Sequence, residues 1–182
     1  MDSMTFLLFG ATGDLAKRKI YPALYNLFIN QNISQSFSII GIGRRAMSDV
    51  EFQTRVEQSL ATFSRTSTDD QSGVKEFMSA FRYCQLDTAN TEGYRDLLSL
   101  VKRREAELNI PENRMFYLSV APELFDVIAL NIKESGLWAT KGLNRLIIEK
   151  PFSHNFKSTC ELNAKLSKGF DEDDIYCIDH YL

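Results

Sequence analysis

The chain has 182 residues, of which 44% are hydrophobic and 25% charged, and its formal net charge is −3. This composition is typical of a globular protein with one substantial core, so we expect a single domain over residues 1–182. The acidic balance argues against nucleic acid as a partner, and the short apolar runs and the absence of a signal-peptide pattern predict a cytoplasmic protein with no membrane partner.

The three cysteines are far apart in the sequence. Cys84, Cys160 and Cys177 lack the close spacing of metal ligands, and their number is odd. Neither a disulfide framework nor a metal site is therefore expected, and reduced thiols are the predicted state.

Apolar runs of strand length alternate with helical patterns along the whole chain. The predicted strands are residues 5–9, 37–43, 82–87, 114–120, 144–149 and 175–178. The predicted helices are the segment behind the first strand and its glycine loop, and residues 48–63, 75–81, 91–108, 122–136 and 156–169. Residues 64–73 are polar and predicted to form an exposed loop. This alternation predicts an α/β fold: a Rossmann-like, doubly wound, mainly parallel sheet of about six strands with helices on both faces.

A glycine loop follows the first predicted strand in the stretch FLLFGATGDLAKRKIYP. It has two glycines, Gly10 and Gly13, where the dinucleotide-binding fingerprint has three, and Ala16 can take the place of the third. A pyrophosphate needs backbone N–H groups without obstructing side chains and the positive end of a helix dipole, and a glycine loop that opens a helix supplies both. The alternative is an ordinary strand-to-helix turn with Asp14 as the N-terminal cap.

Two arginines, Arg44 and Arg45, follow the second predicted strand, where this fold places the adenosine ribose. An NAD site usually has a carboxylate there, whereas the 2′-phosphate of NADP needs cations. Guanidinium groups suit a phosphate, and no Asp or Glu occurs between Gly41 and Ser48. The pattern favours NADP, with NAD as the alternative coenzyme and a solvated surface pair as the alternative role of the arginines.

Other polar groups follow the later strands, and ligands of such sheets lie beyond the carboxyl ends of the strands. Lys150 precedes Pro151, and a cis bond between them would fix the direction of the lysine. Asp179, His180 and Tyr181 offer an acceptor, an imidazole and a phenol side by side. Taken alone, that triplet is weak support for a site, because a histidine in it can equally be structural.

Five motifs, in order and across nearly the whole chain, together resemble one family. They are GATGDLAKRKIYP, GIGRR, RMFYLSVAP, NRLIIEKPF and IDHYL, and they are similar to the N-terminal coenzyme domain of the glucose-6-phosphate dehydrogenase family. The resemblance implies oxidation of glucose 6-phosphate at carbon 1 to 6-phosphoglucono-1,5-lactone, the first step of the pentose phosphate pathway, with hydride transfer to NADP. The EKP strand end by itself also occurs in other sugar oxidoreductases.

The resemblance also implies roles for particular residues. The coenzyme would contact Gly10, Thr12, Gly13, Asp14, Leu15, Arg44, Arg45, Ala121, Pro122 and Lys150. The sugar phosphate would contact Lys19, Lys150, His180 and Tyr181. Asp179 matches the carboxylate that orients the catalytic base, and Lys150 is the other implied catalytic residue.

The base itself is a histidine that the family carries beyond the position of Leu182, together with a second domain that completes the substrate pocket and the dimer interface. We therefore expect this chain to be the coenzyme part of a homodimeric or larger enzyme and to be inactive by itself. The alternative is a Rossmann module that senses NADP(H) without catalysis. The group Lys150, Asp179, His180 and Tyr181 favours the dehydrogenase, because a sensor has no need of it.

Overall fold

A computed structural model of the chain describes residues 3–32, 36–150, 166 and 169–179. Among these residues, six parallel strands form one sheet in the order β3-β2-β1-β4-β5-β6. The strands are β1 (Thr5–Phe9), β2 (Ser38–Gly43), β3 (Phe81–Gln85), β4 (Arg114–Leu118), β5 (Asn144–Lys150) and β6 (Ile175–Asp179). The order reverses between β1 and β4, which is the topological switch point of a doubly wound sheet. The predicted fold class is confirmed.

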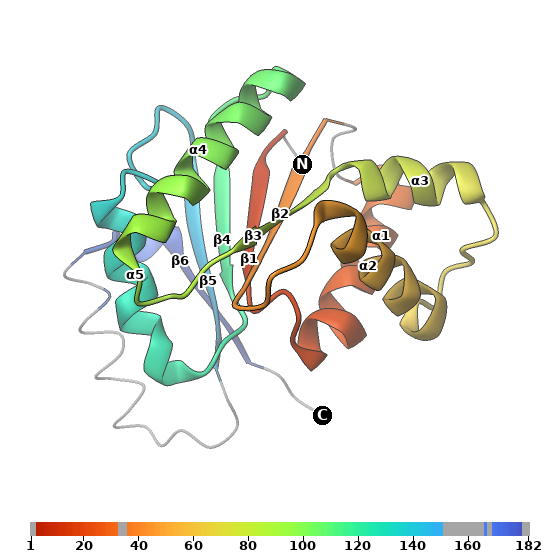
Figure 1. Cartoon of the computed structure of the whole chain (residues 1–182), viewed down its shortest axis with the longest axis horizontal. Coiled ribbons are helices and arrows are strands. Elements are labelled where there is room, and N and C mark those ends of the chain that lie inside the picture. Colours follow the sequence, from red (N-terminus) through yellow and green to blue (C-terminus); the bar gives the residue numbers. More distant parts are fainter. Residues whose placement is uncertain (1–2, 33–35, 151–165, 167–168, 180–182) are drawn as a thin grey trace.

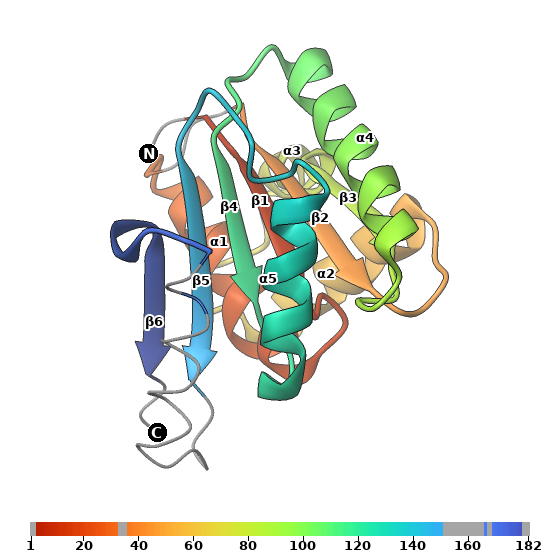
Figure 2. The same cartoon turned by 90° about the vertical axis from the view of Figure 1, so that its left-hand side faces the viewer.

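Helices cover both faces of the sheet (Figure 1). The helical elements are the π-helix η1 (Ala16–Ile20), α1 (Tyr21–Ile29), α2 (Asp49–Phe63), α3 (Gln71–Ser79), α4 (Thr91–Leu108), the 3₁₀ turns η2 (Pro122–Leu124) and η3 (Glu172–Asp174), and α5 (Phe125–Glu134). Helices α1, α2 and α3 lie on one face, and α4 and α5 lie on the other. Figure 2 shows the arrowheads of β4, β5 and β6 at one edge, so the carboxyl ends of the strands gather there.

The hydrophobic core has two parts, one on each face of the sheet. On β1, Phe6 and Leu8 belong to the cluster under α1, α2 and α3, while Leu7 and Phe9 belong to the cluster under α4 and α5. Every residue of β1 is buried for that reason. A strand covered on both faces reads as a continuous apolar run, which is the pattern that residues 5–9 show in the sequence.

Local side-chain caps fix where two of the helices begin. Ser48 accepts a hydrogen bond from the backbone N–H of Glu51 at 3.1 Å, so α2 starts where its capping pattern predicts. The start of α3 differs from the prediction. Asp70 accepts from the N–H groups of Ser72 and Gly73 at 3.1 and 3.2 Å, and this cap moves residues 71–73 from the predicted loop into the helix.

Several other predicted boundaries are wrong by a few residues. The third strand covers residues 81–85 instead of 82–87, the fourth ends at Leu118, and the second begins at Ser38. The segment predicted as one helix over 122–136 is a 3₁₀ turn followed by α5, which ends at Glu134. The predicted helix over 156–169 lies almost entirely outside the described residues.

The chain leaves β1 through a left-handed residue at the switch point. Gly10 has φ +89°, and a methyl group there would lie 2.0 Å from the carbonyl oxygen of Ser119. The N–H of Ser119 donates to the oxygen of Phe9 at 2.9 Å, so β4 is still bonded to β1 where the glycine loop begins. Only a residue without a side chain fits between the two chains at this point.

A buried ion pair lies at the start of β4. The guanidinium of Arg114 donates from Nε and Nη2 to the carboxylate of Glu105 at 3.0 and 2.8 Å, and from Nη1 to the oxygen of Leu137 at 2.8 Å. Arg114 and Glu105 are both buried. The bidentate pair links the end of α4 to β4 and to the segment after α5, and it compensates two charges that would be costly to bury alone.

Removing one partner of this pair should destabilise the chain strongly. We expect Glu105→Ala to lower the free energy of unfolding by about 3 kcal/mol or more, because it leaves a buried, uncompensated guanidinium. Urea unfolding measures the loss. The matched control is Glu92→Ala, which removes a carboxylate that is 74% exposed and pairs with Arg95, and should cost no more than about 1 kcal/mol. Equal losses would contradict the role given to the buried pair.

A second left-handed glycine allows the cost of the backbone clash at Gly10 to be measured apart from the cost of its left-handed conformation. Gly136 has φ +91°, but a methyl group added there would lie 3.6 Å from the nearest atom, Cδ2 of Leu98. We expect Gly136→Ala to cost about 1–2 kcal/mol of stability from backbone strain, and Gly10→Ala to cost more because strain and a backbone clash add. Thermal unfolding of both variants checks the difference, which vanishes if the clash with Ser119 is unimportant.

Candidate functional site

The glycine loop after β1 and the segment after β2 adjoin at the carboxyl edge of the sheet. The N–H groups of Gly10 and Ala11 both donate to the carbonyl oxygen of Ile42, at 3.0 and 3.1 Å. A methyl group on Gly43 would lie 3.6 Å from Cγ2 of Thr12. The two places that the sequence assigns to the pyrophosphate and to the 2′-phosphate are therefore neighbours, close enough for one molecule to bridge them.

The glycine loop closes on itself and passes directly into a helix. The N–H of Gly13 donates to the oxygen of Gly10 at 3.0 Å, and the N–H of Lys17 donates to the oxygen of Gly13 at 3.3 Å. Asp14 does not cap this helix in the described structure; its carboxylate oxygens lie 2.9 Å from Nε of Arg18. Leu15, at the N-cap position of η1, makes no side-chain hydrogen bond to the N–H groups of the first turn. Uncapped N–H groups at the start of a helix are available to an anion.

A buried tyrosine supports the glycine loop from behind. The hydroxyl of Tyr21 donates to the carbonyl oxygen of Ala11 at 2.5 Å. Tyr21 is almost fully buried, and burial raises its pKa far above the usual value, so the hydroxyl remains a donor at any physiological pH. In the sequence Tyr21 is only one member of an apolar helical pattern, and its polar tip is the single signal of this second role.

Arg44 and Arg45 form the turn after β2, here called the arginine turn, and both side chains are exposed. Among the described residues neither guanidinium makes an ion pair. The backbone of the turn is bonded to β3 instead: the hydroxyl of Tyr83 donates to the oxygen of Arg45 at 2.7 Å, and the side-chain amide of Gln85 donates to the oxygen of Arg44 at 3.2 Å. The sequence analysis missed both anchoring residues, because β3 is distant along the chain and carries no motif.

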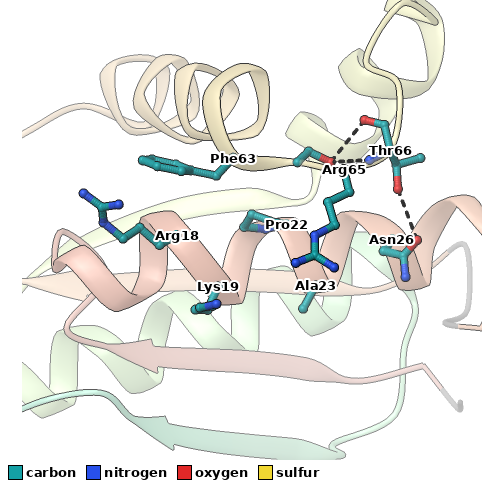
Figure 3. Close-up of a pocket in the computed structure, with 9 residues that line it drawn as sticks. Arg18, Lys19, Pro22, Ala23, Asn26, Phe63, Arg65 and Thr66 are labelled. Carbon is teal, nitrogen blue, oxygen red and sulfur yellow. Dashed lines mark hydrogen bonds between the residues drawn. The ribbon is translucent and has the colours of Figure 1, made fainter. Parts of the chain in front are cut away.

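Lys19 lines a groove of about 490 Å³ between the start of the first helix and the segment after α2, and no residue of the glycine loop contributes to that groove. Figure 3 shows Arg18, Lys19 and Arg65 around this groove. Arg18 is held by Asp14 and lies 4.9 Å over the ring of Phe63. It is Lys17 that lines a small cleft together with Ala11 and Thr12.

The later strands bring the remaining candidates to the same edge. Lys150 and Asp179 are paired in the register of β5 and β6, so their backbones lie opposite one another at the last position of the sheet. Ala121 is exposed and Pro122 half-buried at the start of η2, directly beyond β4. His180, Tyr181 and the Lys150–Pro151 bond, like His154 and Cys160, lie outside the described residues.

A second buried tyrosine joins β4 to β5 near Lys150. The phenol of Tyr117 donates to the carboxylate of Glu149, and both side chains are buried. Burial, with the hydrogen bond as the next cause, raises the pKa of Tyr117 far above its usual value, which makes it a permanent donor to the carboxylate. The strand end that carries the EKP motif is thereby fixed to its neighbour in the sheet.

The described residues hold no group of three or more His, Cys, Asp or Glu side chains placed to bind a metal ion. Burial raises the pKa of the Cys84 thiol to about 11, so this cysteine is protonated at neutral pH. No helix in the described part of the chain has the length and apolar character needed to cross a membrane.

Comparisons with known proteins agree on one family. Residues 7–182 match the family model described as "Glucose-6-phosphate dehydrogenase, NAD binding domain". The chain is 43% identical over 97% of its length to the glucose-6-phosphate 1-dehydrogenase of Bacillus subtilis, and 40% identical over 96% to that of Leuconostoc mesenteroides. It spans about 35% of the length of each of these relatives.

Solved structures give the same result for the fold. A structure described as glucose-6-phosphate dehydrogenase in complex with its substrate glucose-6-phosphate matches 99% of this chain and 37% of its own length, with a TM-score of 0.88 at 34% identity. The enzyme from Mycobacterium avium matches with a TM-score of 0.81 at 26% identity, over 97% of this chain and 36% of its own. These matches show that the chain belongs to the family of glucose-6-phosphate dehydrogenase NAD-binding domains.

Proposed function

We propose that this chain binds NADP at the carboxyl edge of its sheet and is the coenzyme domain of a glucose-6-phosphate dehydrogenase. The pyrophosphate lies on the glycine loop, against Gly10, Thr12 and Gly13 and the first turn that carries Asp14 and Leu15. Because the N–H groups of Gly10, Ala11 and Gly13 are bonded within the fold, its donors come from Thr12 and that first turn. The 2′-phosphate of the adenosine ribose lies on the arginine turn. Family membership supports a nicotinamide coenzyme, and the two cations support the phosphorylated one.

The observation that carries the proposal is the carbonyl of Ile42, which holds the glycine loop against the end of β2. The pyrophosphate and the adenosine ribose are adjacent parts of one molecule, so their binding groups must be adjacent too. The residues present also fit the ligand. The guanidinium groups of the arginine turn are exposed and make no ion pair within the described residues, so they are available to a phosphate.

The other end of the coenzyme points to the later strands. We place the nicotinamide near Ala121 and Pro122, which follow the switch-point strand β4. When bound, NADP accepts a hydride from carbon 1 of glucose 6-phosphate, which gives 6-phosphoglucono-1,5-lactone. We assign Lys150 to both the coenzyme and the sugar, because it ends β5, whose carboxyl end adjoins that of β4.

The sugar phosphate is assigned to Lys19, Lys150, His180 and Tyr181 by the family resemblance. Asp179 orients the histidine that takes the proton of the anomeric hydroxyl. The pairing of Lys150 with Asp179 across β5 and β6 supports a common site for these groups. That histidine and the subunit contacts of the proposed homodimer or larger assembly belong to parts of the family outside these 182 residues.

Coenzyme preference tests the role of the arginine turn. We expect the chain to bind NADP⁺ more tightly than NAD⁺, and the double variant Arg44→Ala/Arg45→Ala to reduce the ratio of the two dissociation constants at least about tenfold, because charge-assisted hydrogen bonds to the 2′-phosphate are lost. Isothermal titration calorimetry with both nucleotides measures the ratio.

The matched control for this test is Arg95→Ala/Arg103→Ala, which removes the same charge from exposed positions on α4. The ratio of its two dissociation constants should equal that of the parent chain. Adding salt should weaken NADP⁺ binding to the parent chain and to this control variant alike. An unchanged preference in the arginine-turn variant would show that the 2′-phosphate is bound elsewhere.

A turnover assay tests whether residues 1–182 are sufficient for the reaction. We expect residues 1–182 alone to bind NADP⁺ without reducing it in the presence of glucose 6-phosphate, because the base that takes the proton is not among them. Absorbance of NADPH measures the reaction, with a full-length relative as the positive control. Turnover at about 1 s⁻¹ or faster would refute this expectation.

A further inference from the structure

The arginine turn is exposed, yet its backbone is held on one side by β3. Tyr83 and Gln85 are two residues apart on that strand, so their side chains lie on the same side of the backbone, and each donates to one carbonyl of the turn. These two hydrogen bonds fix the carbonyls of Arg45 and Arg44 in turn. The guanidinium groups therefore extend from a backbone that two side chains of β3 hold.

Tyr83 is itself held from two directions. Its backbone N–H donates to the carboxylate of Asp49 at 2.7 Å, and its ring packs against that of Phe52 with centroids 5.2 Å apart. The first turn of α2, which begins at Asp49, therefore fixes the middle of β3. Tyr83 is 8% exposed, so its hydroxyl reaches the edge of the sheet from a ring that is part of the core.

The space for this hydroxyl is provided by the last residue of β2. A methyl group on Gly43 would lie 2.7 Å from Oη of Tyr83, closer than van der Waals contact permits. Burial raises the pKa of Tyr83, against the opposing effect of Arg45 and Arg55, so the phenol is protonated and remains a donor to the carbonyl of Arg45.

We propose that Tyr83 and Gln85 are positioning residues that hold the arginine turn in the geometry that binds a 2′-phosphate, and that they thereby set the preference for NADP over NAD. The inference rests on the proposed function of Arg44 and Arg45. Binding a phosphate with two guanidinium groups requires both to be directed at it, and a turn that is ordered beforehand avoids the entropic cost of ordering it on binding. Neither residue needs to contact the coenzyme for this effect.

The test uses Tyr83→Phe and Gln85→Ala in the 182-residue chain, with the dissociation constants of NADP⁺ and NAD⁺ measured by calorimetry. We expect each variant to lower the preference for NADP⁺ about three- to tenfold, the usual effect of one lost hydrogen bond. The affinity for NAD⁺, which has no 2′-phosphate, should change less. Gln85 is exposed, so its variant tests the proposal without disturbing the core.

The matched control is Tyr94→Phe. The hydroxyl of Tyr94 also donates to a backbone carbonyl, that of Thr88, at 2.8 Å, and Tyr94 is buried on α4. This variant loses a hydrogen bond of the same kind and a similar amount of stability, but it leaves the arginine turn unchanged. We expect its coenzyme preference to match that of the parent chain.

Combining Tyr83→Phe with Arg44→Ala/Arg45→Ala distinguishes the possible outcomes. If Tyr83 acts through the arginines, its substitution lowers the preference in the parent chain and has no effect in the arginine-free background. An equal loss in both backgrounds overturns the proposal, and so does an unchanged preference in Tyr83→Phe and Gln85→Ala. If the arginine-free variant keeps its preference, or if the parent binds neither nucleotide, the proposed function itself fails and this inference fails with it.

Discussion

One carbonyl group organises the candidate site: the oxygen of Ile42, which accepts hydrogen bonds from the N–H groups of both Gly10 and Ala11. Those bonds continue the pairing of β1 and β2 past the end of the regular strands, so the loop after one strand and the turn after the other cannot move apart. Gly10 makes this possible, since its left-handed backbone turns the chain while lying against Ser119 of the neighbouring connection. The spacing of the proposed pyrophosphate and ribose subsites is thus a consequence of sheet register.

Three tyrosines perform the same task at three points of the edge. Tyr21, Tyr83 and Tyr117 all belong to the hydrophobic cluster under α1, α2 and α3, and burial raises the pKa of each. Their rings fix them in the core, while their hydroxyls donate to the glycine loop, the arginine turn and the carboxylate of Glu149, respectively. The core on this face therefore extends to the polar edge, where buried rings help to position the glycine loop, the arginine turn and the end of β5.

Sequence patterns predicted most of the fold because burial on both faces and helical spacing leave signals within short windows. Both the strand of residues 5–9 and the cap at Ser48 were found in this way. Features that depend on contacts between segments far apart in the sequence leave no such signal. Tyr83 looks like any strand aromatic until β2 is placed beside it, and Arg114, at the start of a strand, gives no sign in the sequence that its charge is buried against Glu105. The roles proposed for the site residues rest on the resemblance of the ordered motifs to the family. That order indicates which residues share a site, but it carries no information about the distances between them.

A ligand anion can use only those cationic side chains that no carboxylate already pairs with. The chain is acidic overall, at −3, and the first turn of its first helix carries Arg18, which Asp14 already neutralises. Arg44 and Arg45 have no such partner among the described residues, and their backbone is bonded through carbonyls that leave the guanidinium groups unused. An anion at this edge therefore meets unpaired positive charge at the arginine turn, on the side of the loop where a 2′-phosphate must lie if the pyrophosphate occupies the glycines.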